Sequence, residues 1–167
     1  MAVTSDEFKS ALRRFASGIT VITARADGQD HGMTASAFSS LSLNPPQILV
    51  CVARSAAMHA VLMDAGAFGV TLLADTQQPL SDRFAGRFPK DQDRFADLEI
   101  SRGPDSGAAW LPGGLAWLDC RVARALDGGD HTIFVGEVTA ARSNDALEPH
   151  TALLYLAGRY RTVGDAL

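Results

Sequence analysis

The chain has 167 residues, of which 47% are hydrophobic and 20% charged, and its formal net charge is -4 at pH 7. This size and composition indicate one globular domain and exclude an intrinsically disordered chain. The negative charge and the lack of a Lys/Arg cluster argue against nucleic-acid binding. Asp64 interrupts the longest apolar stretch and the N-terminus lacks a signal-peptide pattern, so we expect a cytoplasmic protein.

The first residues predict a helix followed by a strand. Thr4 and Glu7 form a capping-box pattern ahead of apolar residues that recur at helical spacing, and Gly18 is expected to end this helix. Residues 19–24 then predict a strand, because they form a short and mostly β-branched run.

The next region predicts more strands. The dipeptide Asp27-Gly28 is typical of a hairpin turn. Residues 31–43 are strand-like but rich in small hydroxylated side chains. Residues 47–53 are a continuous apolar run, which predicts a strand buried on both faces.

The middle of the chain predicts two short helices and a long loop. Residues 56–65 predict a helix closed by Gly66, residues 68–74 a strand, and residues 79–85 a second helix. Residues 86–114 are polar, rich in Gly and Pro and without a sustained period. A loop of this length in a compact domain is usually a functional lid or a surface excursion.

The last third predicts two pairs of strands. Residues 115–126 and 132–141 predict a hairpin around residues 127–129, and residues 152–156 and 159–163 predict a terminal pair. Many strands, few helices and no regular βαβ alternation indicate a mainly β protein with short helices, built as a mainly antiparallel barrel.

The hydroxyl-rich strand is the first candidate for a ligand site. Alternate residues of a strand share a face, so Thr34 and Ser36 point the same way, with Ser39 and Ser40 close along the chain. Such a row can offer hydroxyl and backbone groups to the polar edge of a planar heterocycle. The alternative is a solvent-facing strand of ordinary polar residues.

Two further segments suit a flat, phosphorylated ligand. Ser55 is placed to cap a helix whose free N–H groups favour an anion, and the forked guanidinium of Arg54 matches phosphate geometry. A plain helix cap with a solvated arginine is the alternative. Small residues beside an aromatic, in Phe84-Ala85-Gly86, allow close backbone approach to a flat ligand.

His131 is the candidate for a catalytic role. It follows the turn residues Gly129 and Asp130 and opens a strand, a position that holds an imidazole rigidly near a surface. A turn-capping histidine without chemistry is the alternative. The histidines lack metal-ligand spacing, and Cys51 and Cys120 lie in separate apolar runs, so we expect no metal site and two free thiols.

Together these segments resemble the short-chain flavin reductase family, the reductase components of two-component flavin-dependent monooxygenases. The resemblance extends over nearly the whole chain and depends on the order and spacing of its parts. The matching segments are residues 15–23, 32–38, 40–46, 50–55, 83–86, 117–120, 129–138 and 154–160.

The resemblance implies a single flavin reductase-like domain over residues 1–167, with a dimeric, Greek-key-like split β-barrel of the FMN-binding type. It implies an NAD(P)H:flavin oxidoreductase that reduces FMN or FAD by hydride transfer and supplies reduced flavin to a partner monooxygenase. NADH and NADPH both stay open as the co-substrate, and Arg83, Arg87 and Lys90 are candidates to recognise a 2′-phosphate.

Carried over residue by residue, the resemblance places His131 near the nicotinamide, where we expect it to orient the ring or stabilise charge. The residues implied to bind the flavin are Thr34, Ala35, Ser36, Ser39, Ser40, Cys51, Val52, Ala53, Arg54, Ser55, Phe84, Ala85 and Gly86.

Two other functions suit the same barrel. One is a non-catalytic flavin-binding protein for storage or sensing, because a binding pocket and a reductase pocket need almost the same residues. The other is an oxidase acting on a phosphorylated pyridoxal-like substrate. That oxidase would need a basic cluster for a second phosphate, and the sequence has no evident one.

Overall fold

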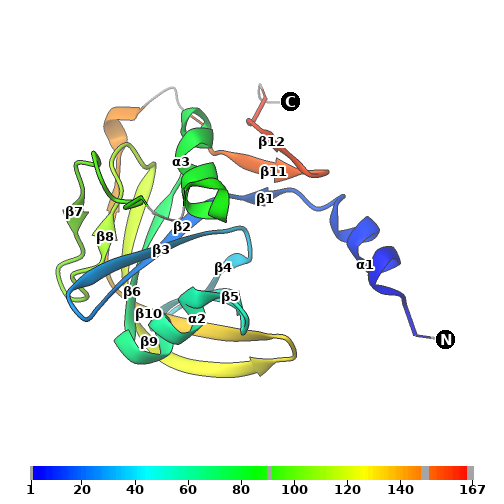
Figure 1. Cartoon of the computed structure of the whole chain (residues 1–167), viewed down its shortest axis with the longest axis horizontal. Helices are drawn as coiled ribbons and strands as arrows, with labels where there is room; N and C mark the ends of the chain where they lie inside the picture. The colour runs from blue at the N-terminus through cyan, green and yellow to red at the C-terminus, as the bar shows by residue number, and fades with distance from the viewer. Residues whose placement is uncertain (1, 90–91, 148–150, 165–167) are drawn as a thin grey trace.

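The computed structural model describes residues 2–89, 92–147 and 151–164, and strands are its main regular elements (Figure 1). The strands are β1 (Ser17–Gly18), β2 (Thr20–Ala26), β3 (Gln29–Ala35), β4 (Phe38–Leu43), β5 (Pro46–Ala53), β6 (Ala67–Leu72), β7 (Ser101–Arg102), β8 (Ala109–Trp110), β9 (Ala116–Gly128), β10 (His131–Ser143), β11 (Leu154–Leu156) and β12 (Arg159–Arg161). Seven of them form an antiparallel sheet in the order β3-β2-β6-β9-β10-β5-β4. A second sheet contains β1, β11 and β12, and β7 pairs with β8.

The helical segments are short. They are α1 (Ser5–Leu12), α2 (Ala57–Ala65), α3 (Gln78–Asp82), the 3-10 turns η1 (Asp75–Gln77) and η3 (Asp145–Leu147), and the π-helical turn η2 (Arg83–Arg87). Figure 1 shows α1 standing away from the body of the molecule, and none of its residues is buried. Within the described ranges, no helix has the length and apolar character needed to cross a membrane.

Two clusters of buried apolar side chains stabilise this arrangement. The larger lies between the sheet and α2 and includes Ile22, Val50, Leu62, Phe68 and Phe134. The smaller joins the sheet to the turn η2 and the C-terminal region and contains Ile19, Val21, Leu73, Phe84, Leu111 and Leu153. The sheet is therefore covered from both sides by short elements.

The prediction of a mainly β fold with short helices is confirmed, but the described strands do not close as a barrel. The seven-stranded sheet is open, and β3 and β4 are its edges. These two strands are joined by only Ser36 and Ala37, yet β3 pairs with β2 while β4 pairs with β5. They diverge at this junction, which leaves each with one free edge.

The N-terminal helix has the predicted start and a different end. Thr4 and Glu7 form the capping box, with the backbone N–H of Thr4 donating to Glu7 Oε2 at 2.8 Å. The prediction that Gly18 ends the helix is wrong. The helix stops at Leu12, and Gly18 belongs to β1, where it pairs with Leu154.

Local turn signals were better guides. Asp27 and Gly28 have φ angles of 50° and 76°, and they form the predicted two-residue turn between β2 and β3. Gly66 has a φ of 62° and ends α2 as predicted, with its N–H donating to the carbonyl of Leu62 at 3.2 Å. In each case the left-handed backbone conformation explains the residue chosen.

The prediction that β5 is buried on both faces is wrong. Ile48, Val50 and Val52 are buried in the core, whereas the alternate residues Leu49 and Cys51 are only partly covered. The strand has one buried face and one partly exposed face. The sequence did not show this difference, because the partly exposed face is also apolar.

The long segment 86–114 is not a featureless loop. It contains β7 and β8, and its residues 108–111 are buried. The buried carboxylate of Asp119 holds it in place by accepting hydrogen bonds from the backbone N–H groups of Asp105 (2.8 Å) and Ser106 (3.1 Å). This anchoring explains how a polar, glycine-rich stretch keeps one conformation.

Candidate functional site

A cavity of about 710 Å³ lies along β3, from Asp30 to Ser36. One side is formed by the first turn of α2, including Ala57. The opposite side is formed by η2 and by residues 92–95. The cavity therefore combines an edge strand with α2 and with the neighbouring residues 84–87 and 92–95, which come from later parts of the chain.

The free edge of β3 brings backbone polar groups to this cavity. In an antiparallel ladder every second residue turns its N–H and C=O away from the paired strand. Counting from the two-residue turn before β3, Gly32 and Thr34 belong to that outward set. The carbonyl of Gly32 accepts a hydrogen bond from Arg94 Nη1 at 3.4 Å, which agrees with this count. A planar ligand can find both donors and acceptors here.

Two aromatic rings form the wall opposite Gly32. Phe84 and Phe95 meet edge to face with their centroids 5.1 Å apart, and both line the cavity. A Cβ on Gly32 would lie 2.6 Å from Phe84 Cε1 and 3.2 Å from Phe95 Cζ. Only glycine allows this close approach, so Gly32 and the two rings are one packing unit.

A chain of hydrogen bonds ties the cavity wall together. Thr34 Oγ1 donates to the carbonyl of Ser81 at 2.6 Å, and the Ser81 hydroxyl lies 3.0 Å from Tyr160 Oη. Tyr160 Oη donates to Asp82 Oδ1 at 2.9 Å, and the same oxygen accepts from Arg87 Nη1 at 2.8 Å. Burial raises the pKa of the Tyr160 phenol above its ordinary value, and the neighbouring Asp82 acts in the same direction. The phenol thus stays protonated and keeps its role as donor.

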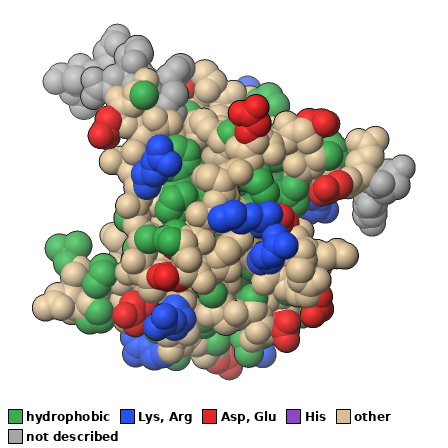
Figure 2. Space-filling view, turned by 90° about the vertical axis from the view of Figure 1, so that its left-hand side faces the viewer, with side chains coloured by type: hydrophobic (Ala, Val, Ile, Leu, Met, Phe, Trp, Pro, Cys, Tyr) green, Lys and Arg blue, Asp and Glu red, His purple; other side chains and the backbone are tan. Residues whose placement is uncertain are grey.

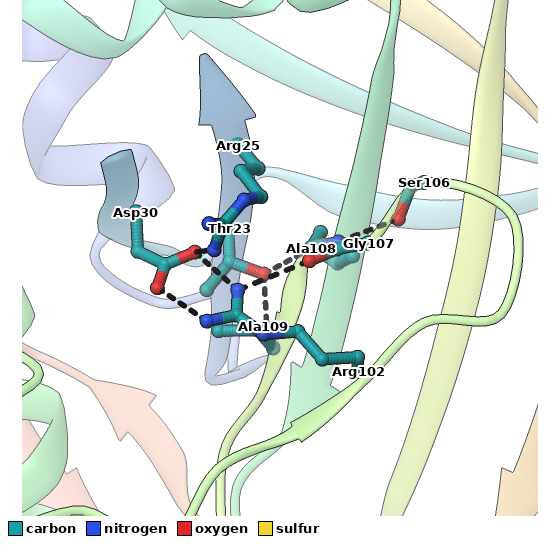
Figure 3. Close-up of polar contacts among 9 residues, drawn as sticks. Thr23, Arg25, Asp30, Arg102, Ser106, Gly107, Ala108 and Ala109 are labelled. Atoms are coloured by element: carbon teal, nitrogen blue, oxygen red, sulfur yellow. Dashed lines mark hydrogen bonds and ion pairs between the residues drawn. The ribbon is translucent and has the colours of Figure 1, made fainter. Parts of the chain in front are cut away.

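An ion-pair cluster fixes the Asp30 end of the cavity. The carboxylate of Asp30 pairs with Arg102 through both of its oxygens, one of them at 2.8 Å, and with Arg25 at 3.4 Å (Figure 3). Arg102 also donates to the carbonyl of Gly107 at 3.1 Å. On the face that carries β7 and β8, Lys and Arg side chains gather near the centre with an acidic side chain beside them (Figure 2). The cluster therefore joins β3 to the segment 86–114.

Five of the residues predicted to bind flavin line this cavity. They are Thr34, Ser36, Phe84, Ala85 and Gly86. Gly86 lies inside η2 with a φ of 79°, in the left-handed region, which explains the glycine. The neighbour Ala35 does not line the cavity, because its side chain is buried in the core on the other face of β3.

The other predicted residues on β4 and β5 lie elsewhere. Ser39 and Cys51, with Ser36, line a second cavity of about 610 Å³ next to α1. Burial raises the pKa of the Cys51 thiol, and neither cysteine forms a disulfide, as predicted. Ser40 is exposed on β4, and Val52 is fully buried in the core. The structure thus distributes these residues among the second cavity, the exposed surface and the core.

The polar residues at the start of β10 form a third group. Arg54 Nη2 donates to Asp127 Oδ1 at 2.9 Å, and its backbone N–H donates to the carbonyl of Asp130 at 3.0 Å. His131 Nδ1 lies 2.7 Å from Asp130 Oδ1, and this hydrogen bond lowers the pKa of the Asp130 carboxyl. His131 pairs across the sheet with Ala53. None of these residues lines either cavity.

The prediction that Ser55 caps the following helix is wrong. The helix α2 begins at Ala57, its N-cap is Ala56, and no side chain bonds to its first N–H groups. Ser55 is exposed in the turn before it. Because Ala56 and Ala57 line the first cavity, the uncapped end of α2 still faces that cavity.

Sequence reasoning missed Gly32, Phe95, Arg94 and Tyr160 as cavity residues. The isolated glycine inside a strand was a usable signal, since it often marks a close approach by other groups. The remaining three come from segments whose position only the tertiary fold defines. No group of three or more His, Cys, Asp or Glu side chains among the described residues is arranged to hold a metal ion.

Comparison with known proteins places this chain in a family. Residues 12–164 match the flavin reductase like domain, so the chain belongs to that family. The reductase component of 4-hydroxyphenylacetate 3-monooxygenase from Thermus thermophilus is 42% identical over 156 residues, which cover 93% of this chain and 95% of that protein. The NADH-dependent FAD reductase of Streptomyces globisporus is 38% identical, over 88% of this chain and 79% of that protein.

Solved structures show the same fold. An NADH:FAD oxidoreductase from Streptomyces globisporus superposes with a TM-score of 0.89 at 34% identity, covering 99% of this chain and 98% of that one. The flavin reductase component of a bacterial two-component tryptophan halogenase gives 0.87 at 41% identity, covering 98% and 100%. Similarity over nearly the whole of each chain shows that the fold is shared.

Proposed function

We propose that this protein is an NAD(P)H:flavin oxidoreductase that reduces FMN or FAD by hydride transfer and supplies the reduced flavin to a partner monooxygenase. The observation that carries the proposal is the cavity along the free edge of β3, in a chain of the flavin reductase family. Relatives named as NADH-dependent FAD reductase and as NADH-using FMN reductase support both flavins and favour NADH.

The residues of the cavity fit an isoalloxazine ring. The ring has carbonyl and N–H groups along one edge, and the outward backbone groups of Gly32 and Thr34 can pair with them. The Phe84 side chain offers an apolar wall, and Ala85 and Gly86 leave room for a second flat ring. When bound, the flavin supplies the redox chemistry, and the protein orients it and provides an apolar surface that excludes water.

In this proposal His131 acts near the nicotinamide. Hydride transfer needs the two rings stacked at roughly 3–3.5 Å, so a group that orients the nicotinamide helps the reaction. The Asp130 carboxylate engages Nδ1 of His131, which leaves Nε2 to face a ligand. For Arg54 and Ser55 to approach a phosphate, Arg54 must exchange its contact with Asp127 for the ligand.

The same proposal includes a homodimer with a split barrel of the FMN-binding type. Phe8, Leu12 and Phe15 are each more than half exposed on or just after α1, and Leu43 on the edge strand β4 is 94% exposed. The second cavity lies between this helix and β4. A second copy of the chain would cover this apolar surface, and light scattering of the purified protein measures the expected doubled mass.

The proposal also includes a partner monooxygenase, a single-domain organisation and a location in the cytoplasm. Reductase components that serve monooxygenases for 4-hydroxyphenylacetate, resorcinol and 4-nitrophenol support a monooxygenase as the partner. We assign the chain as a single flavin reductase-like domain of the cytoplasm. The family match over residues 12–164 supports one domain.

A steady-state assay tests the function. NADH and NADPH are each combined with FMN, FAD and riboflavin, and nicotinamide oxidation is followed by absorbance. We expect turnover with at least one pair and, in His131→Ala, a reduced rate or a raised Michaelis constant for the nicotinamide. We expect no change in the control variant Arg124→Ala, because Arg124 is exposed on β9 and lines neither cavity. Flavin binding without nicotinamide oxidation in every pair would instead support the flavin-storage alternative.

A further inference from the structure

The proposed reaction changes the charge of the flavin. A hydride carries one proton and two electrons, so the reduced ring gains a negative charge unless a further proton reaches it from elsewhere. A charge that develops in a partly desolvated cavity is stabilised by cations or hydrogen-bond donors that already face it. The cavity along β3 should therefore contain a side chain that can oppose this negative charge.

His31 on β3 lines this cavity and is half-buried. Within the described residues, no hydrogen bond, ion pair or ring contact engages its imidazole. The two other histidines of those residues are engaged. His59 Nε2 lies 2.8 Å from the hydroxyl of a threonine on β10, and His131 Nδ1 lies 2.7 Å from Asp130 Oδ1. A half-buried imidazole with both nitrogens free is suited to bind a ligand.

The position of His31 brings it to the strand edge that carries the outward backbone groups. Alternate residues of a strand point to opposite faces, so His31 shares a face with Met33, which packs into the larger core cluster with Met58 of α2. Gly32 points to the other face, where the ring of Phe84 lies. The cavity therefore has one aromatic side and one side formed by His31 and α2.

The start of α2 adds partial positive charge on the His31 side. Ala56 and Ala57 line the cavity, and no side chain caps the first N–H groups of this helix, which has 9 residues. Unsatisfied N–H groups carry the positive end of the helix dipole. The charge of the helix end is fixed, whereas the charge of a histidine can change during a reaction.

The other charged or titratable side chains of the lining are engaged or keep one charge. The carboxylate of Asp30 is paired with two arginines, as Figure 3 shows. Asp93 accepts the backbone N–H of Phe95 at 2.8 Å. Arginine and tyrosine do not ordinarily change charge near neutral pH, but histidine does, so His31 can follow the charge of the ligand. Besides His31, these side chains are Asp30, Arg87, Asp93, Arg94, Tyr155 and Tyr160.

We propose that His31 holds a proton whenever reduced flavin occupies the cavity, and that the resulting imidazolium stabilises the negative charge of the ring. In this balance the nicotinamide gives a hydride to the ring and becomes NAD(P)⁺, while one proton from solvent forms an N–H bond on His31. The imidazole is only half-buried, so solvent can supply that proton. The proton returns to solvent when the reduced flavin leaves. This inference rests on the proposed function, because it assigns a further residue to the same cavity.

Binding of the two redox states tests this role without nicotinamide. Oxidised FMN and dithionite-reduced FMN are each titrated anaerobically into wild type, His31→Gln, His31→Lys and Arg124→Ala, and bound flavin is measured by equilibrium dialysis. We expect His31→Gln to weaken binding of reduced FMN about 10- to 100-fold, the effect of losing a charged hydrogen bond, and to leave oxidised FMN within about twofold. His31→Lys keeps a positive charge and should weaken reduced FMN less. Arg124→Ala removes a cation that lines neither cavity and should change neither affinity.

Proton uptake gives an independent measurement. The imidazole resonances of His31 are assigned by their loss in His31→Gln and followed by NMR at about pH 8, where a histidine is ordinarily neutral. We expect reduced FMN to convert His31 to the protonated form and oxidised FMN to leave it neutral.

Three outcomes would overturn the inference: equal weakening of both redox states in His31→Gln, unchanged binding in that variant, or an imidazole that stays neutral with reduced FMN. A loss in His31→Lys as large as in His31→Gln would also overturn it. These measurements need no turnover, so such results leave the proposed function standing wherever wild type oxidises NAD(P)H with a flavin. Equal thermal melting of the four proteins excludes a folding defect as the cause.

Discussion

The cavity along β3 and the turn at the start of β10 are built in opposite ways. The cavity draws its walls from segments that are distant in the chain, as in the contact of Thr34 with the carbonyl of Ser81. At the turn, exposed polar side chains contact one another in pairs, Arg54 with Asp127 and His131 with Asp130. The cavity is a hollow formed by tertiary packing, whereas the turn is a polar, exposed cluster.

The difference shows which parts of a site a sequence motif can indicate and which parts depend on tertiary packing. Charged and histidine residues at a turn stand out in a sequence, yet the side chains of Arg54 and His131 are 51% and 42% exposed and already engaged. The cavity depends instead on a glycine and two phenylalanines, whose role follows from packing alone. Substitutions in the two regions should therefore differ in both size and kind of effect.

The largest effect is expected for Phe84→Ala. The Phe84 side chain is 1% exposed and belongs to the smaller core cluster, so its loss leaves a cavity in the core and removes one wall of the site. We expect the free energy of unfolding to fall by about 3–5 kcal/mol and flavin binding to weaken more than tenfold. Chemical denaturation and flavin titration measure the two. Unchanged flavin affinity in a folded variant would contradict the assignment of this wall.

A smaller loss is expected for Gly32→Ala. The added Cβ meets the Phe84 ring at 2.6 Å, and the buried ring has little room to move. We expect the free energy of unfolding to fall by about 1–3 kcal/mol, with weaker flavin binding. Gly18→Ala is the matched control, because no other group lies within 4 Å of its Cβ position. Equal stability and flavin affinity of the two variants would mean that the Phe84 ring moves aside without an energetic penalty.

Arg54→Ala tests whether the turn takes part in binding. If Arg54 reaches the flavin phosphate, we expect FMN affinity to fall by about 1–3 kcal/mol, the loss of a charged hydrogen bond. Stability should change by less than about 1 kcal/mol, because the ion pair with Asp127 is exposed. Asp127→Asn, which frees Arg54, serves as the control and should not weaken FMN binding. Identical FMN affinity in wild type and Arg54→Ala would make the turn purely structural.

The smallest effect concerns Asp130. Its pKa is lowered by the hydrogen bond with His131, so the folded state favours the ionised carboxyl. The resulting stabilisation is present above the ordinary aspartate pKa and is lost as the pH falls through the lowered value, below about pH 4. A carboxyl NMR titration should show the pKa of Asp130 returning to its ordinary value in His131→Ala. A low pKa that persists in this variant would show that His131 is not its cause.

Local signals in the sequence predicted much of the fold. The turn at Asp27 and Gly28, the end of α2 at Gly66 and the long hairpin of β9 and β10 depend on backbone preferences of a few neighbouring residues. Such preferences are readable because they do not need tertiary contacts. The end of α1 was misplaced, since Gly18 is held by β11, far along the chain.

The candidate site was only partly readable for the same reason. Thr34 and Ser36 were found because they share a face of one strand, and Phe84, Ala85 and Gly86 because they are consecutive. Arg94 and Tyr160 carry no local signal, and they reach the cavity only through the path of the segment 86–114 and the docking of the C-terminal strands. That path is set by buried contacts such as those of Asp119, which no spacing rule predicts.

The open edge of β3 also affects the solubility of the protein. Unpaired N–H and C=O groups on an edge strand are a template for pairing with strands of other chains. A ligand seated along Gly32 and Thr34 covers that template, and by mass action it also stabilises the folded state. An enzyme that releases its reduced flavin after each turnover exposes this edge again. The protein should therefore be more soluble when flavin is present than when it is absent, because the bound substrate blocks aggregation through this edge.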